Sequence, residues 1–76
     1  MSDSQIACIE RHNGDRLIVK FGELNGAHYC HVRVHYVNEK GVVIPTKTGI
    51  AIRCDEIFLI HDAIGKACEL AMRVKR

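Results

Sequence analysis

Apolar and polar residues alternate along the first two thirds of the chain, and this alternation predicts β-strands. Val32, Val34 and Tyr36 alternate with Arg33 and His35, which is the two-residue period of a strand. Similar apolar runs occur before and after this stretch, separated by turn-forming residues. We therefore predict an antiparallel sheet with four strands, at residues 6–11, 16–24, 27–37 and 42–52.

The gaps between these runs carry turn signals. Asn-Gly, the dipeptide most typical of tight hairpins, occurs at residues 13–14 and 25–26. Residues 38–41 form a third turn signal, which ends in glycine. Pro45 has no N–H to donate to a strand ladder, so we expect the last strand to bend there. Residues 1–5 are polar for the most part and are expected to be frayed.

From residue 55 onward the hydrophobic period becomes that of a helix, and we predict one over residues 54–74. One apolar flank can cover the sheet while the other needs a partner, so we expect a homodimer formed through this helix. The alternative is a helix that lies deep within a monomer. The first flank holds Ile57, Ile60, His61, Ile64, Ala67, Cys68 and Ala71, and the second holds Leu59, Ala63, Leu70 and Val74.

The length and composition suit a single domain over residues 1–76, with the sheet within residues 6–53. Hydrophobic residues make up 47% of the chain, a large share for a domain that buries only about 60% of its unfolded surface. Surplus apolar surface of this kind is often used in self-association. The order of elements predicts the α+β class, a four-stranded curved antiparallel sheet followed by one C-terminal helix.

A modest positive charge is concentrated on the predicted sheet. The net charge is +2, and residues 1–53 carry seven Lys or Arg against five Asp or Glu, with four of the five histidines. Such a sheet face can neutralise phosphates while neighbouring aromatic rings stack on bases. The alternative is an ordinary solvated face. Four basic side chains point away from the apolar positions of their strands: Lys20, His31, Arg33 and His35.

The stretch from residue 32 to residue 52 resembles part of the single-stranded-DNA-binding domain of the transcriptional positive cofactor four family. That family has a strand of the form I/V-R-x-x-aromatic, a glycine-containing turn, and then P-x-K/R-x-G-I. The resemblance extends over roughly residues 15–71. It implies a homodimer of four-stranded curved sheets whose C-terminal helices pack across the dimer. The matching positions are Val32, Arg33, Tyr36, Gly41, Pro45, Lys47, Gly49 and Ile50.

The same resemblance implies a function. It predicts a non-enzymatic transcription coactivator or regulator that binds single-stranded DNA or melted duplex with little sequence preference. RNA is an alternative ligand, and the transcription machinery is a further expected partner. Carried over by motif, Arg33 would contact a phosphate, Tyr36 would occupy the stacking aromatic position, and Lys47 would be a basic loop contact.

Several positions depart from the family pattern. The family's E-F-K-G run appears here as residues 23–26, E-L-N-G, and the second basic residue of the loop is Thr48. We expect weaker, more salt-sensitive binding, or a shifted set of contacts that uses Lys20, Tyr29 and His31. The alternative function is a protein-interaction or dimerisation module on the same fold, with weak or no nucleic-acid binding.

Tyr36 presents a geometric difficulty. Strict alternation places Tyr36 on the strand face opposite Arg33. Both side chains can meet one nucleic-acid strand only if the protein strand twists or bulges near His35. The alternative for Tyr36 is a half-buried core aromatic.

Metal binding and catalysis have little support in the sequence. Zinc needs four convergent nitrogen or sulfur ligands, usually from paired short spacings, which the scattered histidines and cysteines do not supply. Cys30 and Cys68 are interpreted as small buried hydrophobes. Cys30 and His31 are neighbours that point to opposite strand faces, which is wrong for a nucleophile and its base. We expect no metal, no cofactor and no enzymatic activity.

The sequence also suggests a compartment. The first residues are polar and do not resemble a signal peptide. No apolar run approaches the roughly 20 residues of a membrane helix, so we expect no membrane partner. The four cysteines lack close pairing, which is typical of a cytoplasmic protein with reduced thiols. Nucleoid association is expected in a prokaryotic or viral setting, and a nuclear location in a eukaryote.

Overall fold

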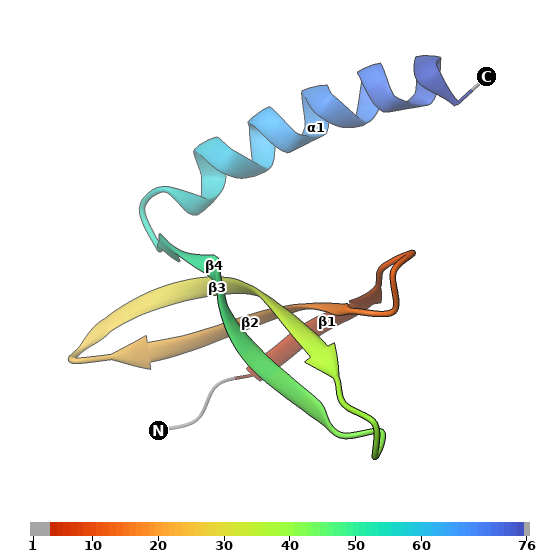
Figure 1. Cartoon of the computed structure of the whole chain (residues 1–76). Coiled ribbons are helices and arrows are strands. Elements are labelled where there is room, and N and C mark those ends of the chain that lie inside the picture. Colours follow the sequence, from red (N-terminus) through yellow and green to blue (C-terminus); the bar gives the residue numbers. More distant parts are fainter. Residues whose placement is uncertain (1–3, 76) are drawn as a thin grey trace.

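Four strands and one helix make up the fold in the computed structural model, which describes residues 4–75. The strands form one antiparallel sheet in the order β1-β2-β3-β4, and α1 follows at its end (Figure 1). The predicted fold class, a four-stranded antiparallel sheet followed by one helix, is confirmed. The elements are β1 (Ser4–Glu10), β2 (Arg16–Leu24), β3 (Ala27–Val37), β4 (Val43–Arg53) and α1 (Ile57–Val74).

The predicted bounds of the first strand, the last strand and the helix start were wrong. The first strand ends at Glu10 instead of residue 11, and the last strand is Val43–Arg53 instead of residues 42–52. Ser4 and Gln5 belong to β1 and pair with β2 rather than fraying, while residues 1–3 lie outside the described part of the chain. The helix begins at Ile57 instead of residue 54. The reason is a turn, in which the N–H of Glu56 donates to the carbonyl of Arg53 at 2.9 Å.

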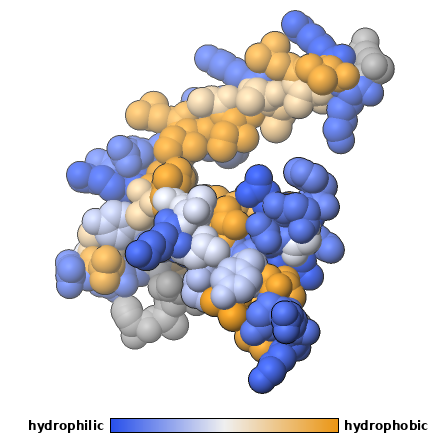
Figure 2. Space-filling model, viewed as in Figure 1, coloured by the Kyte–Doolittle hydropathy of each residue, from blue (hydrophilic) through white to orange (hydrophobic). Residues whose placement is uncertain are grey.

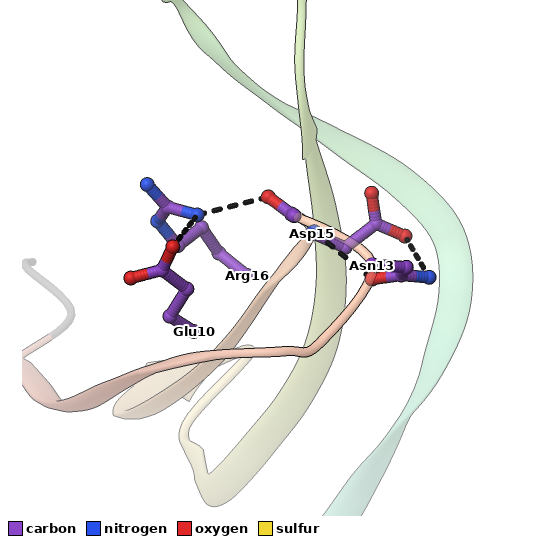
Figure 3. Close-up of polar contacts among 5 residues, drawn as sticks. Glu10, Asn13, Asp15 and Arg16 are labelled. Carbon is purple, nitrogen blue, oxygen red and sulfur yellow. Dashed lines mark hydrogen bonds and ion pairs between the residues drawn. The ribbon is translucent and has the colours of Figure 1, made fainter.

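Short-range polar contacts fix the connection between β1 and β2 (Figure 3). The side-chain oxygen of Asn13 accepts a hydrogen bond from the N–H of Asp15 at 3.0 Å, and its amide donates to the Asp15 carboxylate at 3.3 Å. Arg16 donates to the carbonyl of Gly14 at 2.9 Å and lies 3.8 Å from the carboxylate of Glu10. The connection thus stabilises itself with residues that are close in sequence.

The hairpin between β2 and β3 turns at Asn25 and Gly26, as predicted. Both residues have positive φ, 54° and 81°, which is the geometry of a type I′ turn and the reason that Asn-Gly is favoured there. The tight turn fixes the register of the two long strands, so that Lys20 lies opposite His31 and Ile18 lies opposite Arg33.

A bulge interrupts the pairing of β3 with β4. Arg33 pairs with Gly49 and His35 pairs with Pro45, which leaves residues 46–48 of β4 opposite Val34 alone. The hydroxyl of Thr46 donates to the carbonyl of Val34 at 2.7 Å and closes the distortion. The extra residues are on β4, so β3 keeps its strict alternation through this region.

The two faces of the sheet differ in chemistry. The apolar face carries side chains such as Val19, Phe21, Val32 and Ile52. We call the other side the polar face, and it presents Ile18, Lys20, Tyr29, His31, Arg33 and His35. Within residues 4–75 few side chains are well buried, and the most buried hydrophobic ones are Ile18 at 7% and Ile52 at 8% exposure.

The helix contacts the sheet only near its start. Ile57 and Ile60 are half-buried, whereas residues 61–75 are all exposed. In Figure 1 α1 extends away from the end of β4, and Figure 2 shows apolar side chains along much of its length. The alternative of a helix deep within the monomer is therefore wrong. Cys68 is likewise exposed and not buried, and Cys30 is half-buried.

No helix within residues 4–75 has the length and the apolar character needed to cross a membrane.

Candidate nucleic-acid interface

The polar face contains a hollow of about 480 Å³ at its centre. Three of the predicted contacts, Lys20, His31 and Arg33, line it together. Strand register explains their meeting, because Lys20 and His31 are direct partners across β2 and β3 and Arg33 follows two residues later on the same face. The remaining lining residues are Ile18, His35, Val43 and Pro45. The hollow thus has an apolar base with cationic side chains around it.

Arg33 is held in place by β4. Its Nη1 donates to the carbonyl of Thr46 at 3.0 Å, which leaves other guanidinium N–H groups for a ligand. Gly49 makes this approach of the two strands possible. A Cβ at Gly49 would lie 2.6 Å from the carbonyl oxygen of Val32 and 2.8 Å from the Cα of Arg33. Residues 45–49, which include the bulge of β4, therefore position the arginine.

His35 forms the buried end of the hollow, with 8% of its surface exposed. Its Nδ1 lies 3.2 Å from the carbonyl oxygen of Arg33. Protonated at Nδ1, the ring donates to that carbonyl and keeps a fixed orientation beside the arginine. His35 therefore helps to shape the hollow that Arg33 lines.

Tyr29 lies farther along the polar face, near the β2–β3 hairpin. Its ring centre is 6.0 Å from that of His31, with the planes inclined by 47°. Arg53 is its direct partner on β4. Arg53 was not among the predicted contacts, because the last strand was predicted to end at residue 52. Ala51 pairs with His31, so a residue two positions later in the strand lies on the same face.

Tyr36 and Lys47 lie apart from this group. Tyr36 is 44% exposed and pairs with Ile44 on the apolar face, because the bulge belongs to β4 and leaves the alternation of β3 unchanged. It lines a separate shallow hollow with residues 37–40. Lys47 is exposed on the bulge itself. The structure therefore brings together Lys20, Tyr29, His31 and Arg33 on one face, and the binding role of all six residues stays a prediction.

Among the described residues, no group of three or more His, Cys, Asp or Glu side chains is arranged to hold a metal ion. All four cysteines are free thiols.

Two crystal structures share this fold over most of the chain. Both are of BPSL1147, a PC4 homolog from Burkholderia pseudomallei K96243, where PC4 denotes transcriptional positive cofactor 4. The orthorhombic form has a TM-score of 0.77 and 25% sequence identity, and the match covers 88% of this chain and 90% of that chain. This chain is similar in structure to PC4 homologs. The tetragonal form gives a TM-score of 0.76 at 25% identity and covers 88% and 98% of the two chains.

The likeness to PC4 homologs confirms the family resemblance inferred from the sequence. No protein-family model matches the chain, and no curated protein matches it.

Proposed function

We propose that this protein is a non-enzymatic homodimer that binds single-stranded DNA with little sequence specificity and acts in transcription regulation. The PC4-like fold is that of a nucleic-acid-binding, regulatory family rather than of a class of enzymes. The observation that carries the proposal is the hollow on the polar face, where Lys20, His31 and Arg33 meet. Three potential cations in one open hollow suit a ligand with closely spaced negative charges.

Electrostatic capture is the first part of the proposed mechanism. Lys20 and Arg33 neutralise phosphates, and the release of condensed counterions favours binding. Lys47, on the exposed bulge beside the carbonyl that holds Arg33, extends the cationic surface along the β4 edge. Melted duplex and RNA carry the same phosphates and are bound by the same contacts.

Base stacking is the second part. Tyr29 and His31 offer aromatic rings beside the cations, and stacking on such rings tolerates any base. Tyr36 is on the other face, so it meets the same nucleic-acid strand only where that strand passes around the β3–β4 hairpin. Contacts of these two kinds are made to phosphates and to the flat faces of bases. Because all nucleotides have both features, we expect little sequence preference.

The exposed apolar side chains of α1 support the proposed homodimer. Its side chains Phe58, Leu59 and Met72 are each about two-thirds exposed or more. Apolar surface on this scale marks an interaction site, and a helix in a protein gains most of its stability from packing its apolar face against other elements. A second copy of the chain has the same exposed apolar surface on α1, so each helix would cover the apolar side chains of the other. The dimer then presents two polar faces to one nucleic-acid molecule.

The test is fluorescence anisotropy with a labelled oligo-dT at several salt concentrations. Arg33→Ala should weaken binding about tenfold, which corresponds to the loss of one charged contact. It should also reduce the slope of log affinity against log salt by about 0.7. Arg11→Ala is the matched control, because Arg11 is an exposed cation in the β1–β2 loop.

Two results would contradict the proposal. Equal binding by the parent protein and Arg33→Ala would show that the hollow does not hold the nucleic acid. No binding by the parent, together with a dimer in size-exclusion chromatography, would favour the protein-interaction module on the same fold.

A further inference from the structure

A second hollow, of about 360 Å³, lies where β3 begins and β4 ends. It shares no lining residue with the central hollow of the polar face. Tyr29 and Arg53, direct partners across β3 and β4, connect it to the face that carries His31. The hollow is lined by Ala27, His28, Tyr29, Arg53, Cys54 and Asp55.

Backbone contacts hold this second hollow in a fixed shape. The N–H of Arg53 donates to the side chain of Glu56 at 3.1 Å, and the N–H of Glu56 donates back to the carbonyl of Arg53 at 2.9 Å. The N–H of Cys54 donates to the carbonyl of His28 at 3.2 Å. The segment that carries Arg53 and Asp55 is thereby tied to the strand that carries Tyr29.

Arg53 and Asp55 form a donor and acceptor pair in the hollow that Tyr29 also lines. The Nε of Arg53 lies 3.4 Å from Oδ1 of Asp55, and the two side chains remain 67% and 70% exposed. An exposed ion pair of this kind adds little to stability. It leaves several guanidinium N–H groups and a carboxylate oxygen directed at no other described side chain. The pair is therefore available to a ligand.

The carboxylate gives the second hollow a chemistry different from that of the central one. Asp55 repels phosphate, so a site for the nucleic-acid backbone alone gains nothing from it. A base edge that carries N–H donors gains directly from an ionised acceptor. Unpaired bases are commonly bound by stacking on an aromatic ring with hydrogen bonds to their Watson–Crick edge. Tyr29, Arg53 and Asp55 supply these three elements.

We propose that this second hollow receives one base of the bound single strand and prefers guanine. Guanine presents the acceptor O6, which suits Arg53, next to two neighbouring N–H donors, at N1 and N2, which suit Asp55. Thymine offers a single N–H between two carbonyl oxygens and satisfies the carboxylate less well. The inference rests on the proposed function, and it adds a preference at one position to otherwise unspecific binding.

The experiment compares oligo-dT with the same oligonucleotide carrying a single central deoxyguanosine. For the parent protein we expect the guanine-containing strand to bind about 5–10-fold more tightly, the range of one base-specific contact. Deoxyinosine in the same place lacks the 2-amino group and should give an intermediate affinity. Replacing that base with 2-aminopurine should give quenched fluorescence on binding, because the ring stacks on Tyr29.

Asp55→Asn gives the decisive comparison. Loss of the negative charge should leave the affinity for oligo-dT unchanged or raise it by up to about twofold, while the guanine preference disappears. Glu23→Gln is the matched control, because it removes one exposed acid near the same end of the sheet and should preserve the preference. Melting curves check that both variants are folded.

Each other outcome overturns the inference in a recognisable way. A parent protein that binds oligo-dT with no guanine preference contradicts the guanine site and leaves the proposed function standing. A parent that binds neither oligonucleotide overturns both. If Asp55→Asn lowers the affinities for both oligonucleotides equally, Asp55 has a structural role. If it raises both equally, Asp55 only repels the phosphates.

Discussion

The sheet and the helix of this chain differ in how many of their interactions are made within a single copy of the protein. Each strand is hydrogen-bonded to a neighbour, and side chains within the sheet close the bulge, the β1–β2 connection and the β3–β4 turn. Helix α1 forms its own backbone hydrogen bonds, but none of its residues is fully buried. The polar face is therefore built by a single chain, whereas the apolar side chains of the helix remain largely uncovered within that chain. Residues of the sheet shape the proposed site, and residues of the helix stabilise the proposed assembly.

The strongest test of this division acts on the helix. Ile64→Glu replaces the exposed apolar side chain of Ile64 with a charged one and should abolish the proposed homodimer. Burying an unpaired charge costs about 3 kcal/mol or more, so the melting temperature should fall by at least about 12 °C. Light scattering coupled to size-exclusion chromatography, with thermal melts, provides the measurement. Lys66→Gln on the same helix is the control and should remain dimeric.

A dimeric Ile64→Glu protein with an unchanged melting temperature would show that this part of α1 is not covered by a second copy.

A second test acts on the sheet, through the contact that lets β4 approach β3. Gly49→Ala forces the backbones of Val32 and Arg33 to move, since the new methyl group would lie within 3 Å of both. We expect a loss of about 1–3 kcal/mol in the free energy of unfolding and weaker oligo-dT binding, because Arg33 loses its position. Chemical denaturation and anisotropy measure the two effects.

Gly65→Ala is the matched control for this test. Gly65 lies in α1, and a Cβ there meets nothing within 4 Å in the chain. The same substitution should therefore stabilise the protein, by up to about 1 kcal/mol. Equal effects of the two variants would contradict the distinction between a closely packed sheet and an open helix.

The smallest expected effect distinguishes the two faces of the sheet. Tyr29→Ala should weaken oligo-dT binding about tenfold, since stacking on one ring contributes about 1–3 kcal/mol. Tyr36→Ala, on the apolar face, should change the affinity less than twofold. Anisotropy titrations of both variants measure these affinities. A larger loss of affinity for Tyr36→Ala would show that the nucleic acid binds on the apolar face instead.

Local sequence signals predicted most of the fold, because they act over a few residues. The bounds 16–24 and 27–37 of the two central strands matched the structure, since Asn25-Gly26 fixes the hairpin between them. The helix start was less predictable. It depends on the hydrogen bond between Glu56 and Arg53, which periodicity does not reveal.

The candidate site was predictable only where alternation alone decides placement. Lys20, His31 and Arg33 could be assigned to one face because their strands are regular. Arg53 was missed because its place depends on how far β4 continues. The extent of the bulge was not predictable either, because periodicity does not show that three residues of β4 stand opposite Val34. Tyr36 lies on the face opposite Arg33, as strict alternation predicted.

The bulge also sets a parity rule for the chain. Residues 46–48 stand opposite a single residue of β3. The bulge therefore adds two residues to β4, and alternate residues before and after it face the same side of the sheet. Inserting or deleting one residue there would reverse every later side chain of β4, moving Ile52 to the polar face and Arg53 to the apolar one. A change of two residues would preserve both. Only insertions or deletions of an even number of residues in this bulge therefore keep the two faces of β4 unchanged, whatever residues occupy it.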